Sequence, residues 1–434
     1  MTFVKESDEI LDLAIIGFGP ASVSLMVALH DHSEKPLRNK KVCVLEKLPY
    51  FSWHAGMLIP GSKMQISFVK DLATPRDPTS YFSFLNYLHQ HGCERFSGFL
   101  NLSTMEPSRY EFHDYLCWAA GHFKDYVKYN ANVTKLEYDQ SLDLYRIIYG
   151  DQQKVAKNVI VATGGQANIP EPFSSLQSPQ VIHSSGFMFD HSQRLLRSAK
   201  HGVLVIGSGQ SAAEIWNHSH NVIDPKLPLS LAFRNLTLIP SDSSPFVNSL
   251  YFDSHNSHWW YNLPEHTRVQ GLKNGHTTNY GVVKESLLEE MYREEYMQKL
   301  KYGKVYHNFS NATYVDSVEQ KQDHVLVTLA SKLDGTEKKV TKEFDVIYLA
   351  TGYNHASSQE ILSSIFPNSH DIHIAENYLV ENTPSKNSRL FVIGISTYQH
   401  GIGETLLSWT AVRAGELATQ LFGPSKPTAR PFDP

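Results

Sequence analysis

Short apolar runs that end in glycine alternate along this chain with segments whose apolar positions have helical spacing. Leu11–Ile16 is such a run, and a helix is predicted directly after it over Ala21–His30. The same order recurs at Val203–Ile206, which precedes a helix predicted over Ser211–His218. A unit of strand, glycine turn and helix therefore begins twice, near residues 11 and 203.

Further apolar runs extend this alternation through most of the chain. Additional strands are predicted at Lys41–Glu46, Asn158–Val161, Leu229–Phe233, His324–Leu329, Asp345–Leu349 and Arg389–Ile395. A charged amphipathic helix is predicted over Glu285–Leu300, and a closing helix over Thr405–Leu421. Alternating strands and helices build parallel sheets, so the predicted fold class is α/β with two Rossmann-like dinucleotide-binding domains.

The composition narrows the class of protein without indicating a function. At 434 residues the chain exceeds one ordinary core, so two or three domains are expected. Hydrophobic residues at 41% and charged residues at 19% indicate a globular protein. The formal net charge of -5 gives no reason to expect a nucleic acid or an anionic membrane as partner. No apolar run is long enough to predict a membrane span.

The cysteines and the first residues bear on the compartment. Cys43, Cys93 and Cys117 are widely separated and form no CxxC pair, which suits a reducing compartment. Residues Met1–Glu9 are polar and do not resemble a secretory signal. We expect a cytosolic protein.

The first glycine turn has the chemistry of a pyrophosphate site. Gly17 permits a tight turn, and Gly19 lets the backbone approach a phosphate at the helix N-terminus, although Ser22 replaces the usual third glycine. Glu46 ends the next strand, where a carboxylate can accept hydrogen bonds from both ribose hydroxyls. The alternative is an ordinary turn with a surface glutamate. The combination of strand, helix and terminal acid favours the nucleotide site.

The second glycine turn differs from the first in the charge that accompanies it. Gly207 and Gly209 repeat the turn, but the partner strand ends at Phe233 and Arg234, a cation where the first unit has an acid. A guanidinium can bind a 2′-phosphate through two hydrogen bonds, whereas a carboxylate would repel it. We therefore predict FAD at the first site and NADPH at the second; the alternative is that Arg234 is a solvated surface residue.

Two nucleotide sites in one chain indicate hydride transfer from NADPH to a flavin. A disulfide reductase would need a redox cysteine pair near the flavin, and the three cysteines offer none. Reaction of the reduced flavin with dioxygen is the remaining common outcome.

Several longer motifs match one family of flavoenzymes. They stand at Gly17–Ser22, Phe51–Met57, Met64–Leu72, Arg76–Pro78, Phe84–Leu88, Gly207–Ala212, Ser244–Asn248, Thr278–Tyr280, Ala350–Tyr353 and Thr405–Ser408. Through them nearly the whole chain resembles the flavin-dependent N-hydroxylating monooxygenases, and within these the L-ornithine N-monooxygenases of hydroxamate-siderophore biosynthesis. Gly401–Glu404 departs in detail from the family pattern, which leaves the shape of the flavin-side loop open.

The resemblance implies roles for particular residues. FAD contacts are implied at Gly17, Gly19, Pro20, Glu46, Lys47, Trp53, His54, Gln65, Val133, Thr405, Leu406 and Leu407. NADPH contacts are implied at Gly207, Ser208, Gly209, Gln210, Ser211, Arg234, Asn279 and Tyr280. Substrate contacts are implied at Lys70, Asn248, Asn279 and Ser408. Outside their motifs, Lys70 would be interpreted as a solvated lysine, the two asparagines as turn residues and Ser408 as a hydroxyl on a helix face. The surrounding motifs favour the substrate roles.

No side chain is assigned as a certain acid, base or nucleophile. Gln65 and Asn279 would position the flavin, the substrate and the nicotinamide, because the flavin itself drives the reaction. No metal is expected, since His54 has no second ligand at a suitable spacing.

The resemblance implies hydroxylation of the side-chain amine of L-ornithine through a flavin hydroperoxide, with FAD, NADPH and dioxygen. The product would supply hydroxamate siderophores for iron acquisition. The alternative substrate is L-lysine or an aliphatic diamine, although a diamine lacks the carboxylate that Lys70 would bind. The alternative from a different class of protein is a non-catalytic NADP sensor.

The expected domain order follows the same family. An FAD-binding domain over residues 1–185 and 355–434 is interrupted by an NADPH-binding domain over 186–354. Residues 243–300 would contribute the amino-acid substrate region, and a homo-oligomer, dimer or tetramer, is expected.

Overall fold

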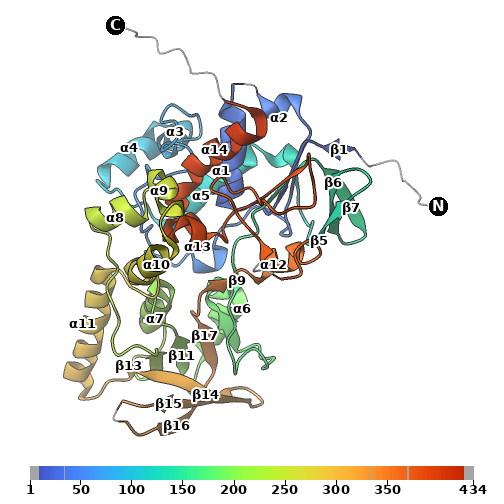
Figure 1. Cartoon of the computed structure of the whole chain (residues 1–434). Coiled ribbons are helices and arrows are strands. Elements are labelled where there is room, and N and C mark those ends of the chain that lie inside the picture. The colour runs from blue at the N-terminus through green and yellow to red at the C-terminus, as the bar shows by residue number, and fades with distance from the viewer. Residues whose placement is uncertain (1–8, 34, 334, 369–370, 425–434) are drawn as a thin grey trace.

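A five-stranded parallel sheet forms the centre of the first domain in the computed structural model, which describes residues 9–33, 35–333, 335–368 and 371–424 (Figure 1). The strand order is β19–β8–β2–β3–β4. These strands are β2 (Leu13–Ile16), β3 (Val42–Leu45), β4 (Val127–Lys128), β8 (Asn158–Val161) and β19 (Arg389–Val392). They are short and almost wholly apolar, as expected for a sheet that is covered on both faces.

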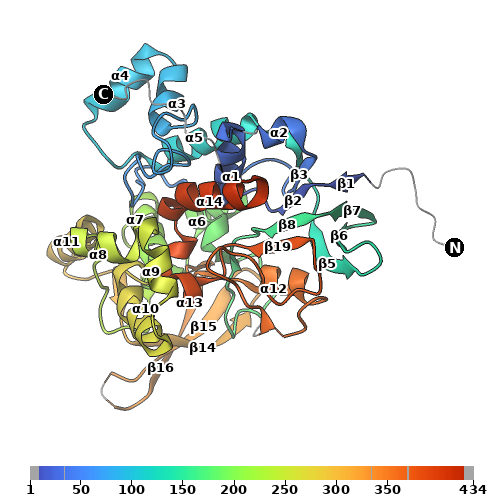
Figure 2. The same cartoon turned by 45° about the horizontal axis from the view of Figure 1, so that its top comes forward.

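Helices cover one face of this sheet, and a second sheet covers the other. Helix α1 (Pro20–Asp31) packs beside α14 (Thr410–Phe422), so an early and a late helix of the chain lie together over the strands (Figure 2). The opposite face carries the four-stranded sheet β1–β7–β6–β5. Its strands are β1 (Ile10–Leu11), β5 (Val133–Asp139), β6 (Leu144–Tyr149) and β7 (Gln152–Ala156).

The second domain repeats the plan of the first. Its parallel sheet has the order β10–β17–β11–β12–β13. The strands are β10 (Val181–His183), β11 (Val203–Ile206), β12 (Leu229–Ala232), β13 (His307–Ser310) and β17 (Val346–Leu349). Helices α6 (Asp190–Ser198) and α7 (Gln210–Val222) pack on this sheet. An antiparallel sheet of β14 (Thr313–Gln320), β15 (Val325–Ser331) and β16 (Lys338–Phe344) adds a further layer.

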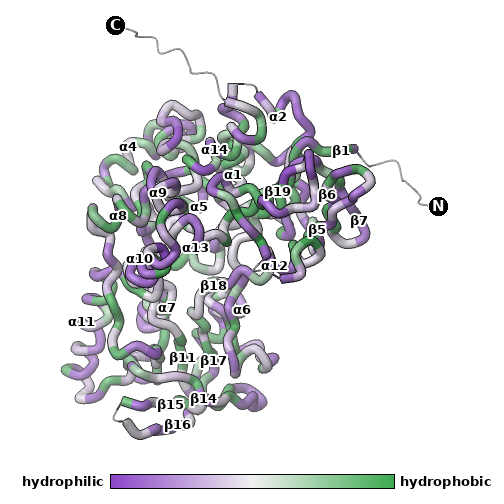
Figure 3. The backbone as a smooth tube through the Cα atoms, viewed as in Figure 1, coloured by the Kyte–Doolittle hydropathy of each residue, from purple (hydrophilic) through white to green (hydrophobic). Residues whose placement is uncertain are grey.

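A helical insertion separates β12 from β13. It contains α8 (Pro245–Tyr251), α9 (Ser257–Tyr261), α10 (Glu265–Asn279) and α11 (Glu285–Tyr302). Hydrophobic positions concentrate along the strands of both sheets, whereas α10 is hydrophilic along most of its length (Figure 3). In the first domain, α3 (Phe84–Gln90), α4 (Cys93–Asn101) and α5 (Arg109–Gly121) form an aromatic-rich outer layer around Phe84.

The chain passes between the two sheets through a short antiparallel ribbon. Strand β9 (Gln166–Ala167) pairs with β18 (Tyr353–Asn354), so the outgoing and the returning segments lie side by side. The returning segment then supplies α12 (Ala356–Leu362), β19 and α14 to the first domain. The first unit is therefore interrupted by the second.

Two predicted boundaries differ from the structure. Val181–His183 pairs with β17, so the second sheet begins before the predicted limit at residue 185; a three-residue strand gives almost no periodic signal. The closing helix begins at Thr410, because Ile402–Thr405 and Leu407–Trp409 form separate 3-10 turns ahead of it. Within the described part of the chain, no helix has both the length and the apolarity to cross a membrane.

Candidate active site

The first glycine turn forms a cradle at the ends of three strands. The backbone of Gly17 has a φ of 95°, and a Cβ there would lie 2.5 Å from the carbonyl oxygen of Ala162, so no other residue fits without a backbone shift. Helix α1 begins directly after Gly19 with Pro20 in its first turn, and it directs unpaired N–H groups toward the cradle. This geometry fits the pyrophosphate of a dinucleotide.

Glu46 connects the glycine turn to the second strand of the unit. Its carboxylate accepts hydrogen bonds from the backbone N–H groups of Phe18 (2.7 Å) and Leu48 (2.8 Å). The side chain is 8% exposed and borders a cavity of about 610 Å³. A carboxylate has lone pairs beyond these two bonds, so it can also accept from a ribose. The predicted ribose ligand thus shapes the turn as well.

The same cavity brings several other residues predicted at the first nucleotide site together. Its wall includes Lys47, Trp53, His54 and Val133, together with both predicted glycines. His54 borders the cavity. Desolvation by the surrounding protein, together with the nearby charges of Arg109 and His113, lowers the pKa of this histidine to about 4. The imidazole is therefore neutral at neutral pH. It suits a wall of the flavin site and adds no positive charge there.

The second glycine turn repeats the cradle in the other domain. Gly207 has a φ of 144°, and a Cβ there would lie 2.4 Å from the carbonyl oxygen of Ala350. Gly209 precedes α7. A Cβ added to it would lie 3.5 Å from the Cα of Gly281. The end of α10 at Asn279 and the residues Tyr280 and Gly281 that follow it therefore cover this turn. The arrangement fits a second dinucleotide.

Arg234 lies just beyond the end of β12, beside the second turn. Its side chain is exposed, and no hydrogen bond or ion pair of it is present among the described residues. It borders neither of the two large cavities. A guanidinium without such a partner is free to bind a 2′-phosphate, and the role predicted for Arg234 from the sequence stays a prediction.

A second cavity of about 560 Å³ lies between the two domains and connects the predicted sites. Its lining contains parts of both nucleotide turns, including Pro20 and Gln210. It also contains the residues predicted for the flavin, the nicotinamide and the substrate: Gln65, Lys70, Asn248, Asn279, Thr405, Leu406, Leu407 and Ser408. Residues that are up to some 340 positions apart in the sequence therefore share one wall.

Two of the predicted substrate residues touch each other. The ammonium Nζ of Lys70 lies 3.4 Å from the amide Oδ1 of Asn248, on α8. The amide nitrogen of Asn248 donates to the carbonyl oxygens of Ser243 (2.6 Å) and Ser244 (3.2 Å), which fixes the orientation of the amide. No carboxylate lies within ion-pair distance of Lys70 among the described residues. Its charge is thus available to an anionic group in the cavity.

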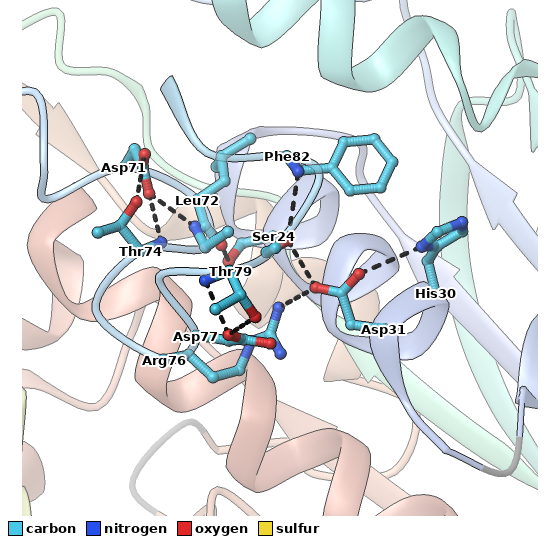
Figure 4. Close-up of polar contacts among 12 residues, drawn as sticks. Ser24, His30, Asp31, Asp71, Leu72, Thr74, Arg76, Asp77, Thr79 and Phe82 are labelled. Carbon is cyan, nitrogen blue, oxygen red and sulfur yellow. Dashed lines mark hydrogen bonds and ion pairs between the residues drawn. The ribbon is translucent and has the colours of Figure 1, made fainter. Parts of the chain in front are cut away.

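The loop that follows Lys70 is held by two carboxylates (Figure 4). Asp71 is 2% exposed and accepts hydrogen bonds from three backbone N–H groups, of which that of Phe84, at 2.6 Å, lies furthest along the sequence. Asp31, at the end of α1, accepts from the guanidinium of Arg76. These contacts tie the Lys70 loop to the first domain, so the ammonium projects from a rigid support.

The C-terminal turns complete the cavity wall. Ser408 is 5% exposed, and its hydroxyl donates to the carbonyl oxygen of Phe252 at 3.3 Å. The hydroxyls of Tyr280 and Thr405 lie 2.6 Å apart, which joins the loop over the second nucleotide turn to the flavin side of the cavity. Tyr280 itself does not line the cavity, whereas Asn279 does.

Three ion pairs at this cavity were not predicted from the sequence. Arg109 binds both carboxylate oxygens of Glu214 at 2.8 Å, Lys284 pairs with Glu106, and Arg413 lies 3.0 Å from Glu404. The first two join the two domains. No local pattern could have indicated them, because their partners are 105 and 178 residues apart and meet only in the folded molecule.

The fold and the two nucleotide sites define a flavin- and pyridine-nucleotide-dependent oxidoreductase. Residues 9–355 match the family described as L-lysine 6-monooxygenase/L-ornithine 5-monooxygenase. The L-ornithine N(5)-monooxygenase of Schizosaccharomyces pombe is 64% identical over 422 residues, which cover 97% of this chain and 98% of that protein. The chain belongs to this family of monooxygenases.

Two solved structures share the whole architecture. The ornithine hydroxylase PvdA of Pseudomonas aeruginosa is 31% identical with a TM-score of 0.85, covering 95% of this chain and 99% of that one. The ornithine N-hydroxylase KtzI of Kutzneria sp. 744, a complex with reduced FAD, NADP+ and L-ornithine, is 30% identical with a TM-score of 0.84 and the same coverage. The predictions of family and fold class are confirmed.

Proposed function

We propose that this protein hydroxylates the side-chain amine of L-ornithine, with FAD in the first nucleotide site, NADPH in the second and dioxygen as co-substrate. The observation that carries the proposal is the Lys70–Asn248 pair, which lies in the cavity that joins the two nucleotide turns. The relatives named above are ornithine hydroxylases, and this chain matches them over nearly its full length.

The residues of the chain act by binding and orientation. Lys70 attracts the α-carboxylate of the substrate. The carbonyl oxygen of the Asn248 amide holds the ammonium group of Lys70 in place. With that end anchored, the side-chain amine extends along the cavity toward Gln65 and Ser408. When bound at the first site, FAD would supply the redox chemistry between NADPH and dioxygen. Both domains contribute to the cavity wall, so bound substrate and cofactors would displace water from the reacting groups.

The residues at each nucleotide site support the cofactor assignments. The Gly17 cradle and the Glu46 carboxylate fit the pyrophosphate and the ribose of FAD. The Gly207 cradle and the unpaired Arg234 fit NADPH. We assign residues 1–180 and 355–434 to FAD binding and the intervening residues to NADPH binding, with 243–300 contributing to the substrate site.

The decisive test offers L-ornithine, L-lysine and putrescine together to the FAD-loaded enzyme with NADPH. Mass spectrometry should identify N5-hydroxyornithine as the main product. Hydroxylysine as the main product would favour the second substrate of the family, and NADPH consumption that does not depend on any amine would contradict the proposal.

The remaining proposals concern the setting of the reaction. The product would serve hydroxamate siderophores, and the three free cysteines suit the cytosol. The exposed side chains of Tyr292, Tyr296 and Leu300 form a stripe along α11 that supports self-association. Cell fractionation tests the compartment, and light scattering of the purified protein tests self-association.

A further inference from the structure

The charged residues of the cavity between the domains are not all matched to one another. Arg109, Lys284 and Arg413 each form an ion pair with a carboxylate. Of the other side chains in the lining that carry a full charge, Lys63 and Lys70 are cations and Asp242 is an anion. Within the described part of the chain, none of these three has an oppositely charged side chain at ion-pair distance.

Asp242 lies between the two asparagines of the substrate site. Its backbone N–H donates to the carbonyl oxygen of Thr278 at 3.0 Å, directly before Asn279. On its other side, the carbonyl oxygen of Ser243 accepts a hydrogen bond of 2.6 Å from the amide of Asn248. That amide bridges the Asp242 segment and Lys70, because its oxygen faces the Lys70 ammonium. The Lys70 cation and the segment that carries the Asp242 anion therefore contact the same Asn248 amide, and both Lys70 and Asp242 line the cavity.

The carboxylate of Asp242 is ionised and is held by the turn in which it lies. Its Oδ1 accepts a hydrogen bond of 2.8 Å from the backbone N–H of Ser244, which precedes α8. The hydrogen bonds from Ser244 hold the pKa of Asp242 below its usual value. This Asx turn uses part of the capacity of the carboxylate, and further lone pairs remain for a cation in the cavity.

We propose that Asp242 binds the α-ammonium group of the amino-acid substrate, while Lys70 binds its α-carboxylate. The inference rests on the proposed function, and it assigns the zwitterionic end of the substrate to two side chains of opposite charge that line the same cavity. An α-amino acid carries both charges on one carbon, so one cation and one anion a short distance apart match it. A diamine lacks the α-carboxylate, and an ω-amino acid lacks the α-ammonium group.

The test compares L-ornithine with 5-aminopentanoate, which has the same carboxylate and the same terminal amine but no α-ammonium. Asp242→Asn is the variant of choice, because asparagine keeps the Asx turn and removes only the charge. Asp253→Asn is the matched control. That carboxylate is also near Lys70 and accepts from His255, but it does not line the cavity.

In the wild type, 5-aminopentanoate should be hydroxylated with a kcat/KM about ten- to a hundredfold below that of ornithine, as expected for one charge-assisted contact. Asp242→Asn should reduce kcat/KM for ornithine by a similar factor, mostly through KM, and leave 5-aminopentanoate within about threefold. FAD content and the melting temperature should match the wild type. Asp253→Asn should change neither substrate selectively.

Equal losses with both substrates in Asp242→Asn would reduce the residue to a structural turn and overturn the inference. An unchanged preference for ornithine in that variant would overturn it as well. A wild-type protein that makes no hydroxyornithine would instead contradict the proposed function, so the two failures are distinguishable.

Discussion

Lys70 is the side chain on which the substrate assignment depends most directly. Lys70→Ala should raise the KM for ornithine strongly, because the substrate carboxylate loses its charged partner. The loss of binding free energy should be about 2–5 kcal/mol. Flavin content should be unchanged, since Lys70 does not border the first nucleotide cavity. We expect NADPH oxidation to continue with peroxide as the main product.

Separate assays for hydroxylamine and peroxide at several ornithine concentrations measure this uncoupling. Putrescine, which has no carboxylate, serves as the control substrate, and its slow turnover should be the same in both proteins. Unchanged ornithine affinity in a folded, flavin-loaded Lys70→Ala protein would rule out the substrate site described here.

Arg234 should determine the choice between NADPH and NADH. Its unpaired guanidinium lies at the end of β12, so Arg234→Ala removes a contact that only the 2′-phosphate of NADPH can make. The KM for NADPH should rise by roughly ten- to a hundredfold, whereas that for NADH should stay nearly constant. Steady-state kinetics with both nucleotides provide the measurement. An equal rise for both would assign the phosphate to another residue.

Sequence patterns indicated individual residues where a motif surrounds them, and few elsewhere. Lys70, Asn248 and Ser408 each lie in a long family motif, and the structure places all three in one cavity wall, where their substrate roles stay predictions. Arg109 and Glu214 could not be predicted, because their pairing depends on how two domains meet. Glu46 was predicted as a ribose ligand, but its hydrogen bonds to backbone N–H groups became visible only in three dimensions.

At the scale of single elements, the second glycine turn offers a selective test. Gly207→Ala would place a methyl group 2.4 Å from a carbonyl oxygen and would require an unfavourable φ of 144°. The turn must shift, so NADPH oxidation should be lost or greatly weakened while FAD remains bound. Gly209→Ala has ordinary contacts, the nearest at 3.5 Å, and should melt like the wild type.

Helix α7 and strand β13 should make stability depend on pH. His307 is 0% exposed on β13, and burial, together with His220 on α7, lowers its pKa to about 4. The unfolded chain takes up a proton on this histidine near pH 6.5, whereas the folded chain does not. Stability should therefore fall between pH 6.5 and 4, by up to about 3 kcal/mol, and this contribution is constant above pH 6.5.

Urea unfolding at pH 7.5 and pH 5 measures this loss. In His307→Gln the difference between the two pH values should shrink by a large part of that amount. An identical pH dependence in the variant would assign the effect to other groups.

Elements with strong periodicity were predicted from the sequence, and weakly patterned ones were not. Strands β2, β8, β11 and β17 are continuous apolar runs, and their positions followed from that pattern alone. Helix α10 carries almost no apolar stripe and buries only Gly275, so nothing in its sequence marks a helix. Its neighbours in the folded molecule, not its own pattern, define its place.

At the scale of the whole molecule, the Arg109–Glu214 pair should hold the two domains in register. Both side chains are largely buried, and Glu214→Gln would leave the Arg109 guanidinium without its counter-charge, at about 3–5 kcal/mol. We expect a lower melting temperature and faster proteolysis between the domains. The surface pair Lys339–Asp316 is the control, and Lys339→Ala should leave the melting temperature nearly unchanged, because solvent screens an exposed ion pair.

Replacing both partners by apolar residues, as in Arg109→Met with Glu214→Leu, should restore much of the loss. Differential scanning calorimetry and limited proteolysis distinguish these outcomes. A Glu214→Gln protein that melts like the wild type would show that the domains are held by other contacts.

The pairing of β8 with β19 also governs how the chain can fold while a ribosome is making it. Arg389 of β19 follows Asn158 of β8 by 231 residues, so at usual rates of synthesis it emerges roughly 10 to 50 seconds later. During that interval the whole NADPH-binding unit has appeared and can fold, whereas β8 still presents an open apolar edge. The domain that begins first is therefore completed last, and its unfinished sheet is the part of the nascent protein that most needs protection from aggregation.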